Sequence, residues 1–117
     1  MGRLGRVELQ FRGDGVGSSL RVEYEDEELR LLAVDATYVA NGLSRDVIKA
    51  YRKVIQLIGA ATDERDLYAL RGLRLKQLQG DRAGTHSMRL NDQYRLIATF
   101  KTDGERAAVV IELVDYH

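Results

Sequence analysis

The spacing of apolar residues along the chain predicts helices in the first half and strands in the second half. The clearest helix begins after Ser44, a favourable N-cap residue, and ends near Gly59. Its apolar residues recur at helical spacing and form one stripe, which consists of Val47, Tyr51, Val54, Ile55 and Ile58. We therefore expect an amphipathic helix that packs its apolar stripe against a core.

Two shorter helices and a first strand surround this helix in the prediction. Leu20–Glu25 alternates apolar and polar residues, as a half-buried strand does. The acidic residues 25–28 suit the positive N-terminus of a helix that ends near Ala33 or Val34. Asp63 is a possible cap for a further short helix through Leu70.

The second half of the chain changes to an alternating period and predicts strands joined by hairpins. The expected strands are an imperfect one over Leu73–Leu78, then His86–Leu90, Gln93–Phe100 and the almost wholly apolar Ala107–Val114. Asn91-Asp92 is expected to form a two-residue turn that pairs Leu90 with Gln93, and residues 102–105 a second hairpin. The predicted class is α+β, with two or three N-terminal helices packed on a mainly antiparallel sheet of about four to five strands.

The chain is predicted to hold one domain over residues 20–117. Residues 1–19 contain five glycines and little amphipathic pattern, so we expect a flexible or mis-annotated extension, with Leu20 as a candidate start. The alternative is that Val7–Phe11 adds an edge strand or contacts a protein partner.

Composition narrows the class of protein. Apolar residues make up 44% of the chain and charged residues 31%, which is an ordinary globular balance. No apolar run is long enough to span a bilayer, so no membrane association is expected. Cysteine is absent, which excludes disulfides and suits a cytoplasmic protein. With only two histidines, His86 and His117, we expect no metal centre and no cofactor.

The charge is zero overall but unevenly distributed. Between Arg71 and Arg106 there are eight basic and four acidic residues, so this segment carries 8 − 4 = +4. A mild positive patch of this kind is typical of a protein that binds phosphate groups, although a mixed solvated surface gives the same count.

Two groups of residues in this region have chemical potential. Arg95 lies inside an otherwise apolar strand, where a charge needs either a phosphate ligand or a carboxylate partner such as Asp115. Asp115 and His117 are two residues apart, so in a continued strand they share a face, with Tyr116 on the other. An Asp beside a His can orient the imidazole or raise its pKa.

The run GDRAGTHSMRLNDQYR and the ending VDYH together resemble the RelE-like toxin superfamily, specifically its HigB branch of ribosome-dependent mRNA interferases. The resemblance covers roughly residues 20–117 and implies the α+β fold of that family. It implies a toxin of a type II toxin–antitoxin system that cleaves translated mRNA on the ribosome by acid–base chemistry, without a metal. The implied partners are the ribosome, mRNA and a cognate helix-turn-helix antitoxin.

The resemblance also implies roles for single residues. It assigns phosphate binding to Arg95 and catalysis to Asp115, Tyr116 and His117. Lys76 stands where some members carry a histidine, and it is included in the catalytic set as a group that stabilises phosphate charge. Gln79 stands where they often carry a lysine. The expected RNA-binding residues are Arg82, His86 and Arg89, although packing or base stacking suits His86 better than catalysis.

A second function class fits the same residues. The superfamily includes ParE-like members that bind DNA gyrase and do not cut RNA, and a degenerate member could serve only to bind its antitoxin. Arg95 and the Asp-Tyr-His ending favour the nuclease, whereas Lys76, Gln79 and the near-neutral charge favour the binding module.

Overall fold

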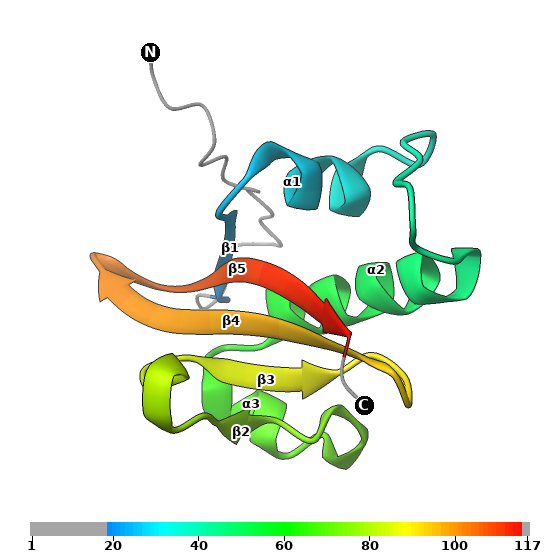
Figure 1. Cartoon of the computed structure of the whole chain (residues 1–117). Helices are drawn as coiled ribbons and strands as arrows, with labels where there is room; N and C mark the ends of the chain where they lie inside the picture. Colours follow the sequence, from blue (N-terminus) through cyan, green and yellow to red (C-terminus); the bar gives the residue numbers. More distant parts are fainter. Residues whose placement is uncertain (1–18, 116–117) are drawn as a thin grey trace.

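The computed structural model describes residues 19–115, which form three α-helices and a five-stranded sheet (Figure 1). In chain order the elements are β1 (Arg21–Tyr24), α1 (Glu27–Val34), α2 (Arg45–Ala60), α3 (Glu64–Tyr68), the 3-10 helix η1 (Arg71–Leu73), β2 (Lys76–Gln77), the 3-10 helix η2 (Gly80–Arg82), β3 (His86–Arg89), β4 (Tyr94–Asp103) and β5 (Glu105–Asp115). The predicted edge strand or contact at Val7–Phe11 and the predicted extension lie outside the described residues.

A side chain caps each of the three helices, and two of the caps, Ser44 and Asp63, are the predicted ones. Ser44 Oγ accepts a hydrogen bond from the Val47 amide at 3.2 Å, and α2 begins at the next residue. Asp26 caps α1 through the Leu29 amide at 3.0 Å. Asp63 caps α3, which ends at Tyr68 and so is two residues shorter than predicted. The apolar stripe predicted for α2 is buried along its whole length, which confirms the amphipathic helix.

The sheet has the strand order β1-β5-β4-β3-β2. Only β1 runs parallel to its neighbour, β5, while the other three pairs are antiparallel, as the sequence predicted. The two long strands β4 and β5 form the centre of the sheet, and Figure 1 shows α2 running behind them.

All three helices cover the same face of the sheet, which we call the helix face. Residues of the three helices and alternate residues of the strands form one hydrophobic cluster, in which the strands contribute Val22, Tyr24, Met88, Leu96, Ala98, Ala108 and Val110. The other face of the sheet, which we call the outer face, receives no helix from the described part of the chain.

A bulge in β5 decides which residues reach each face. Ala98 pairs with Val110, but the next pair along the strands joins Ile97 to Glu112, so Ile111 is the extra residue. The alternation of β5 therefore changes phase at Ile111. Before the bulge Val110 faces the helices, and after it Leu113 does so, packed against the core. Glu112 and Val114 consequently point to the outer face.

The predicted two-residue turn between β3 and β4 is wrong. The Leu90 amide donates to the Tyr94 carbonyl at 3.0 Å, and Arg89 pairs with Arg95, so three residues form the turn. The reason is the side chain of Asn91, whose Oδ1 accepts hydrogen bonds from the amides of Gln93 and Tyr94 at 2.8 and 2.7 Å.

This correction changes the predicted surface, because a shift of one residue moves every side chain of a strand to the other face. If Leu90 paired with Gln93 as predicted, Arg95 would share a face with His86 and Met88. It lies opposite Arg89 on the outer face, while Met88 faces Leu96 in the core.

The strand predicted over Leu73–Leu78 is also shorter than expected. Leu73 belongs to η1, and Arg74 has a left-handed backbone with φ of 50°, which interrupts an extended chain. Only Lys76 and Gln77 pair with β3, so β2 is a short strand at the edge of the sheet.

A buried tyrosine joins the two long helices. Tyr51 of α2 is 0% exposed, and its hydroxyl donates to the Leu29 carbonyl of α1 at 2.7 Å. Burial raises the pKa of this hydroxyl, so it stays a donor at any ordinary pH. Nearby, Arg52 Nε donates to the Leu32 carbonyl at 2.8 Å.

The Tyr51 hydrogen bond gives a testable prediction for stability. Tyr51→Phe keeps the ring but leaves the Leu29 carbonyl without this donor, and we expect the free energy of unfolding to fall by about 1–3 kcal/mol. Urea denaturation followed by circular dichroism measures the change.

Tyr38→Phe is the matched control. The Tyr38 hydroxyl contacts Glu28 at 3.1 Å at the surface, where water replaces a lost partner, so we expect a change within about 0.5 kcal/mol. Equal losses in the two variants would show that the Tyr51 bond does not hold α1 on α2.

Candidate functional site

The outer face carries most of the residues that the sequence singled out. Lys76 of β2 lies opposite Ser87 of β3, which lies opposite Ile97 of β4, and Ile97 lies opposite Glu112 of β5. Directly opposed residues of antiparallel strands share a face. These residues therefore form one row across the sheet from its β2 edge to β5.

A second row lies beside it, nearer to the β3–β4 turn. Arg89, Arg95 and Val114 are opposed across β3, β4 and β5. Within each strand they are two residues from the first row, so the side chains of Arg95 and Glu112 are diagonal neighbours on the same face. The two rows put Lys76, Arg89 and Arg95 on one surface.

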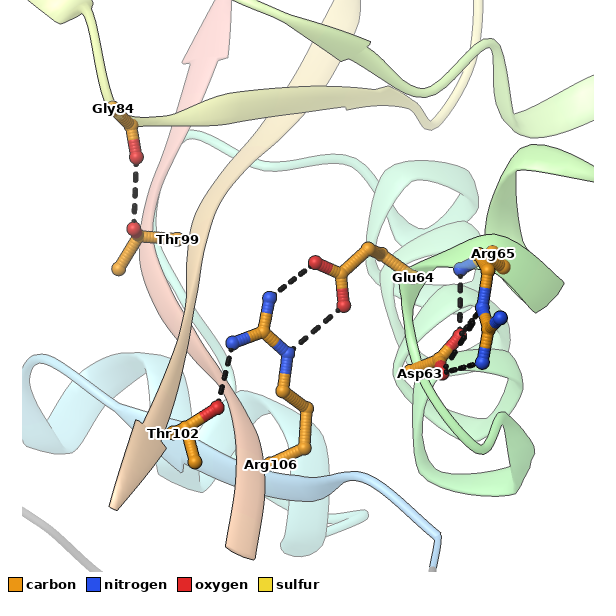
Figure 2. A network of polar contacts seen from close by, with 7 residues as sticks. All are labelled: Asp63, Glu64, Arg65, Gly84, Thr99, Thr102 and Arg106. Atoms are coloured by element: carbon orange, nitrogen blue, oxygen red, sulfur yellow. Dashed lines mark hydrogen bonds and ion pairs between the residues drawn. The ribbon is translucent and has the colours of Figure 1, made fainter.

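Arg82 joins this surface from the loop between β2 and β3. The loop turns through Gly80 and Gly84, which have φ of 66° and 93°, values that favour glycine. Thr99 of β4 donates its hydroxyl to the Gly84 carbonyl at 2.9 Å and so holds the loop on the outer face (Figure 2). From there Arg82 Nη2 reaches Glu112 Oε2 on β5 at 2.8 Å.

We call the surface formed by Lys76, Arg82, Arg89 and Arg95 the basic face. Between these cations, Ile97 and Ser87 are only 3% and 6% exposed, although no described helix covers them. The long stems of charged side chains can cover apolar surface while their heads remain in water. The surface beneath the cations is therefore largely covered by side chains.

Arg95 is partly buried and is fixed to the turn beside it. Its Nη1 donates to the Asn91 carbonyl at 2.7 Å and to the Tyr94 carbonyl at 3.2 Å. Arg89 forms an ion pair with Asp92 in the same turn. Lys76, by contrast, is exposed on the edge strand and forms no ion pair with the described residues.

Asp115 ends β5 at the same end of the sheet as Arg95, but on the other face. It pairs with Tyr94, whose ring packs against the core, and its carboxylate accepts hydrogen bonds from Gln93 Nε2 at 3.2 and 3.3 Å. The expected grouping of Asp115 with Tyr116 and His117 falls partly on residues outside the described part of the chain.

His86 lies apart from the other predicted RNA-binding residues. It is on the helix face, where its ring meets that of Phe100 edge-on with the ring centroids 5.1 Å apart. Burial lowers the pKa of His86, and Arg106 acts in the same direction, while Glu64 opposes both. The contact with Phe100 agrees with the packing role, and the structure does not bring His86 to Arg82 or Arg89.

An arginine network occupies the helix face near His86 (Figure 2). Arg106 Nε donates to Glu64 Oε1 at 3.0 Å, and Arg106 Nη1 donates to the Thr102 hydroxyl at 2.8 Å. The guanidinium lowers the pKa of Glu64. This network ties α3 to β5, and it contains none of the predicted catalytic residues.

The described residues contain no group of three or more His, Cys, Asp or Glu side chains arranged to hold a metal ion. Within the same range, no helix has the length and apolar character needed to cross a membrane.

Sequence reasoning missed Glu112. Glu112 could have been noticed as a single charge inside the apolar run of β5. Strict alternation along the strand, however, predicts that it points to the same face as Ala108 and Val110, which is the core. The bulge at Ile111 turns it to the outer face instead, beside Arg82.

A comparison with curated proteins found no relative. Among solved structures, the chain is similar to a YoeB/ParE toxin from Agrobacterium tumefaciens, with 17% identity, a TM-score of 0.43, and 62% of this chain and 76% of that chain covered. It is also similar to a chain of the toxin–antitoxin complex RelBE2 from Mycobacterium tuberculosis, with 20% identity, a TM-score of 0.40, and 87% and 100% covered.

The comparison with family models is the one that decides the assignment. The model described as the RelE-like toxin of the type II toxin–antitoxin system HigB matches residues 22–117, which include the whole basic face and every helix and strand except the first residue of β1. The chain therefore belongs to the family of HigB-like toxins of type II toxin–antitoxin systems.

Proposed function

We propose that the protein is an endoribonuclease that cleaves translated mRNA on the ribosome. The observation that carries the proposal is the gathering of Lys76, Arg82, Arg89 and Arg95 on one face of the sheet. Several cations on one surface suit a polyanion whose backbone must be held in one position.

RNA cleavage by internal attack needs three kinds of group. A base takes the proton of the ribose 2′-OH, an acid protonates the leaving 5′-oxygen, and positive groups stabilise the charge on the phosphorus centre. Arg95 suits the third role because its position is set by two backbone carbonyls before substrate arrives. The proposed acid is His117, oriented by Asp115, with Tyr116 stacking on a base or holding the site by a hydrogen bond.

Lys76 takes a place in this scheme as a charge-stabilising group. It lies at the edge of the basic face, in the same row as Glu112, and its exposed ammonium is available to a phosphate. Arg82 and Arg89 serve to position the RNA backbone, since each is an exposed or half-buried cation whose carboxylate partner a phosphate could replace.

The partner of the toxin is an antitoxin, and we propose that it is a small helix-turn-helix protein encoded beside this gene. Co-expression of the two open reading frames with a tag on the toxin should copurify both proteins and relieve growth arrest. An adjacent frame without a helix-turn-helix pattern, or no copurification, would contradict this partner.

The catalytic roles predict two losses of activity. Arg95→Ala should lower the rate of mRNA cleavage about 10²–10³-fold, because a fixed donor to the developing charge is lost. Removal of His117 should lower it about 10²–10⁴-fold, as expected for an acid–base group. Primer extension on translated mRNA measures both, and free RNA should be cut poorly by the unmodified protein.

Arg65→Ala is the control for Arg95→Ala. Arg65 is an exposed arginine of α3 that is ion-paired with Asp63, and it lies off the basic face. It should leave cleavage unchanged. Because Arg95 also holds the turn, circular dichroism must show that Arg95→Ala is folded. Full cleavage without His117 would reject its role, and DNA gyrase poisoning in place of RNA cleavage would favour a ParE-like function.

Salt dependence tests the role of the basic face in ribosome binding. Association should weaken as salt rises, and Lys76→Ala should lower the slope of log K against log salt by about 1, because one phosphate contact is lost. Lys53→Ala, which removes an exposed lysine of α2, is the matched control and should leave the slope unchanged. Ribosome pelleting at a series of salt concentrations measures the slopes. Equal slopes for the unmodified protein, Lys76→Ala and Lys53→Ala would exclude Lys76 from the interface with the ribosome.

A further inference from the structure

Glu112 has an unusual position for a carboxylate. It lies on the outer face of β5, opposite Ile97, with Arg82 as its ion-pair partner at 2.8 Å and Arg95 as its diagonal neighbour. Lys76 lies at the far end of the same row. A carboxylate among cations lowers the affinity of a surface for phosphate. If the surface only had to bind phosphate, Glu112 would be unfavourable there, so its presence indicates another role.

Two other carboxylates, Glu23 and Asp92, have positions that suit structural roles. Glu23 of β1 is only 4% exposed and is paired with Arg21 at 2.9 Å and with Lys101 at 3.2 Å, towards the β4–β5 hairpin. Asp92 belongs to the β3–β4 turn and pairs with Arg89. Glu112, by contrast, lies on the outer face beside Arg82 and Arg95, and its side chain is 42% exposed.

We propose that Glu112 is the general base of the reaction, a role that rests on the proposed nuclease function. Its carboxylate takes the proton of the ribose 2′-OH as the 2′-oxygen forms a bond to phosphorus. The bond from phosphorus to the 5′-oxygen breaks, and this oxygen takes a proton from the general acid of the reaction. The products are a 2′,3′-cyclic phosphate and a free 5′-hydroxyl, and Glu112 then releases its proton to water.

The ion pair with Arg82 is compatible with this role. The side chains of Arg82 and Glu112 are 46% and 42% exposed, so their attraction is screened by water and is easily exchanged. A phosphate that enters between them binds the guanidinium, and it leaves the carboxylate beside the sugar that carries this phosphate. Arg82 and Glu112 would then contact neighbouring atoms of one nucleotide, which is the arrangement that the reaction needs.

Glu112→Gln tests the proposal because it keeps the size and polarity of the side chain and removes its ability to accept a proton. We expect ribosome association to stay the same or become tighter, while single-turnover cleavage of translated mRNA falls about 10²–10⁴-fold. Glu112→Asp retains a carboxylate and should keep part of the lost activity. Glu105→Gln is the matched control, because Glu105 is an exposed glutamate of the same strand that is paired with an arginine, and it should cleave normally.

The outcomes separate this role from the proposed function itself. Cleavage by Glu112→Gln at the normal rate would overturn the role of Glu112 and leave the nuclease in place. A loss of cleavage that only follows a loss of binding would also overturn it, because Glu112 would then act by positioning Arg82. No cleavage by the unmodified protein would reject the nuclease function, and the base with it. Thermal unfolding of each variant confirms that the domain is folded.

Discussion

The pairing of β4 with β5, with one extra residue at Ile111, is the constraint on which the rest of the structure depends. Without the bulge, alternation would turn Glu112 and Val114 towards the hydrophobic core. Burying an unpaired carboxylate would lower the stability of the fold by several kcal/mol. One irregular position in the strand pairing lowers it less, so the bulge is the more stable arrangement. The bulge keeps Val110 and Leu113 in the core and places Glu112 among the cations.

The two faces of the sheet differ in what they carry. On the helix face, buried apolar residues of the strands meet the stripe of α2, and burial of this area is the main driving force for folding. On the outer face, Arg82 reaches from the loop before β3 to Glu112 on β5, which is two places from β3 in the sheet. Substitutions of exposed residues on the outer face can therefore change its charge with little effect on the core.

Arg95 shows how a turn can hold a cation in one position. Its Nη1 donates to two carbonyls at the β3–β4 turn. The bonds to the turn set the direction of the side chain and reduce the entropy that a phosphate contact would otherwise cost. The turn itself depends on Asn91, whose side chain accepts from two amides.

Local features of the sequence determined the helices, their caps, the sequence positions of the long strands and the family, because each depends on residues close together in the chain. The stripe of α2 and the cap at Ser44 are of this kind. The register at Asn91 and the bulge at Ile111 depend on competition between side-chain and backbone hydrogen bonds and on the packing of distant strands. Only the tertiary structure could decide the register and the bulge. Because a shift of one residue exchanges the two faces of a strand, these two features also decide that Arg95 lies beside Glu112 and that His86 lies on the opposite face.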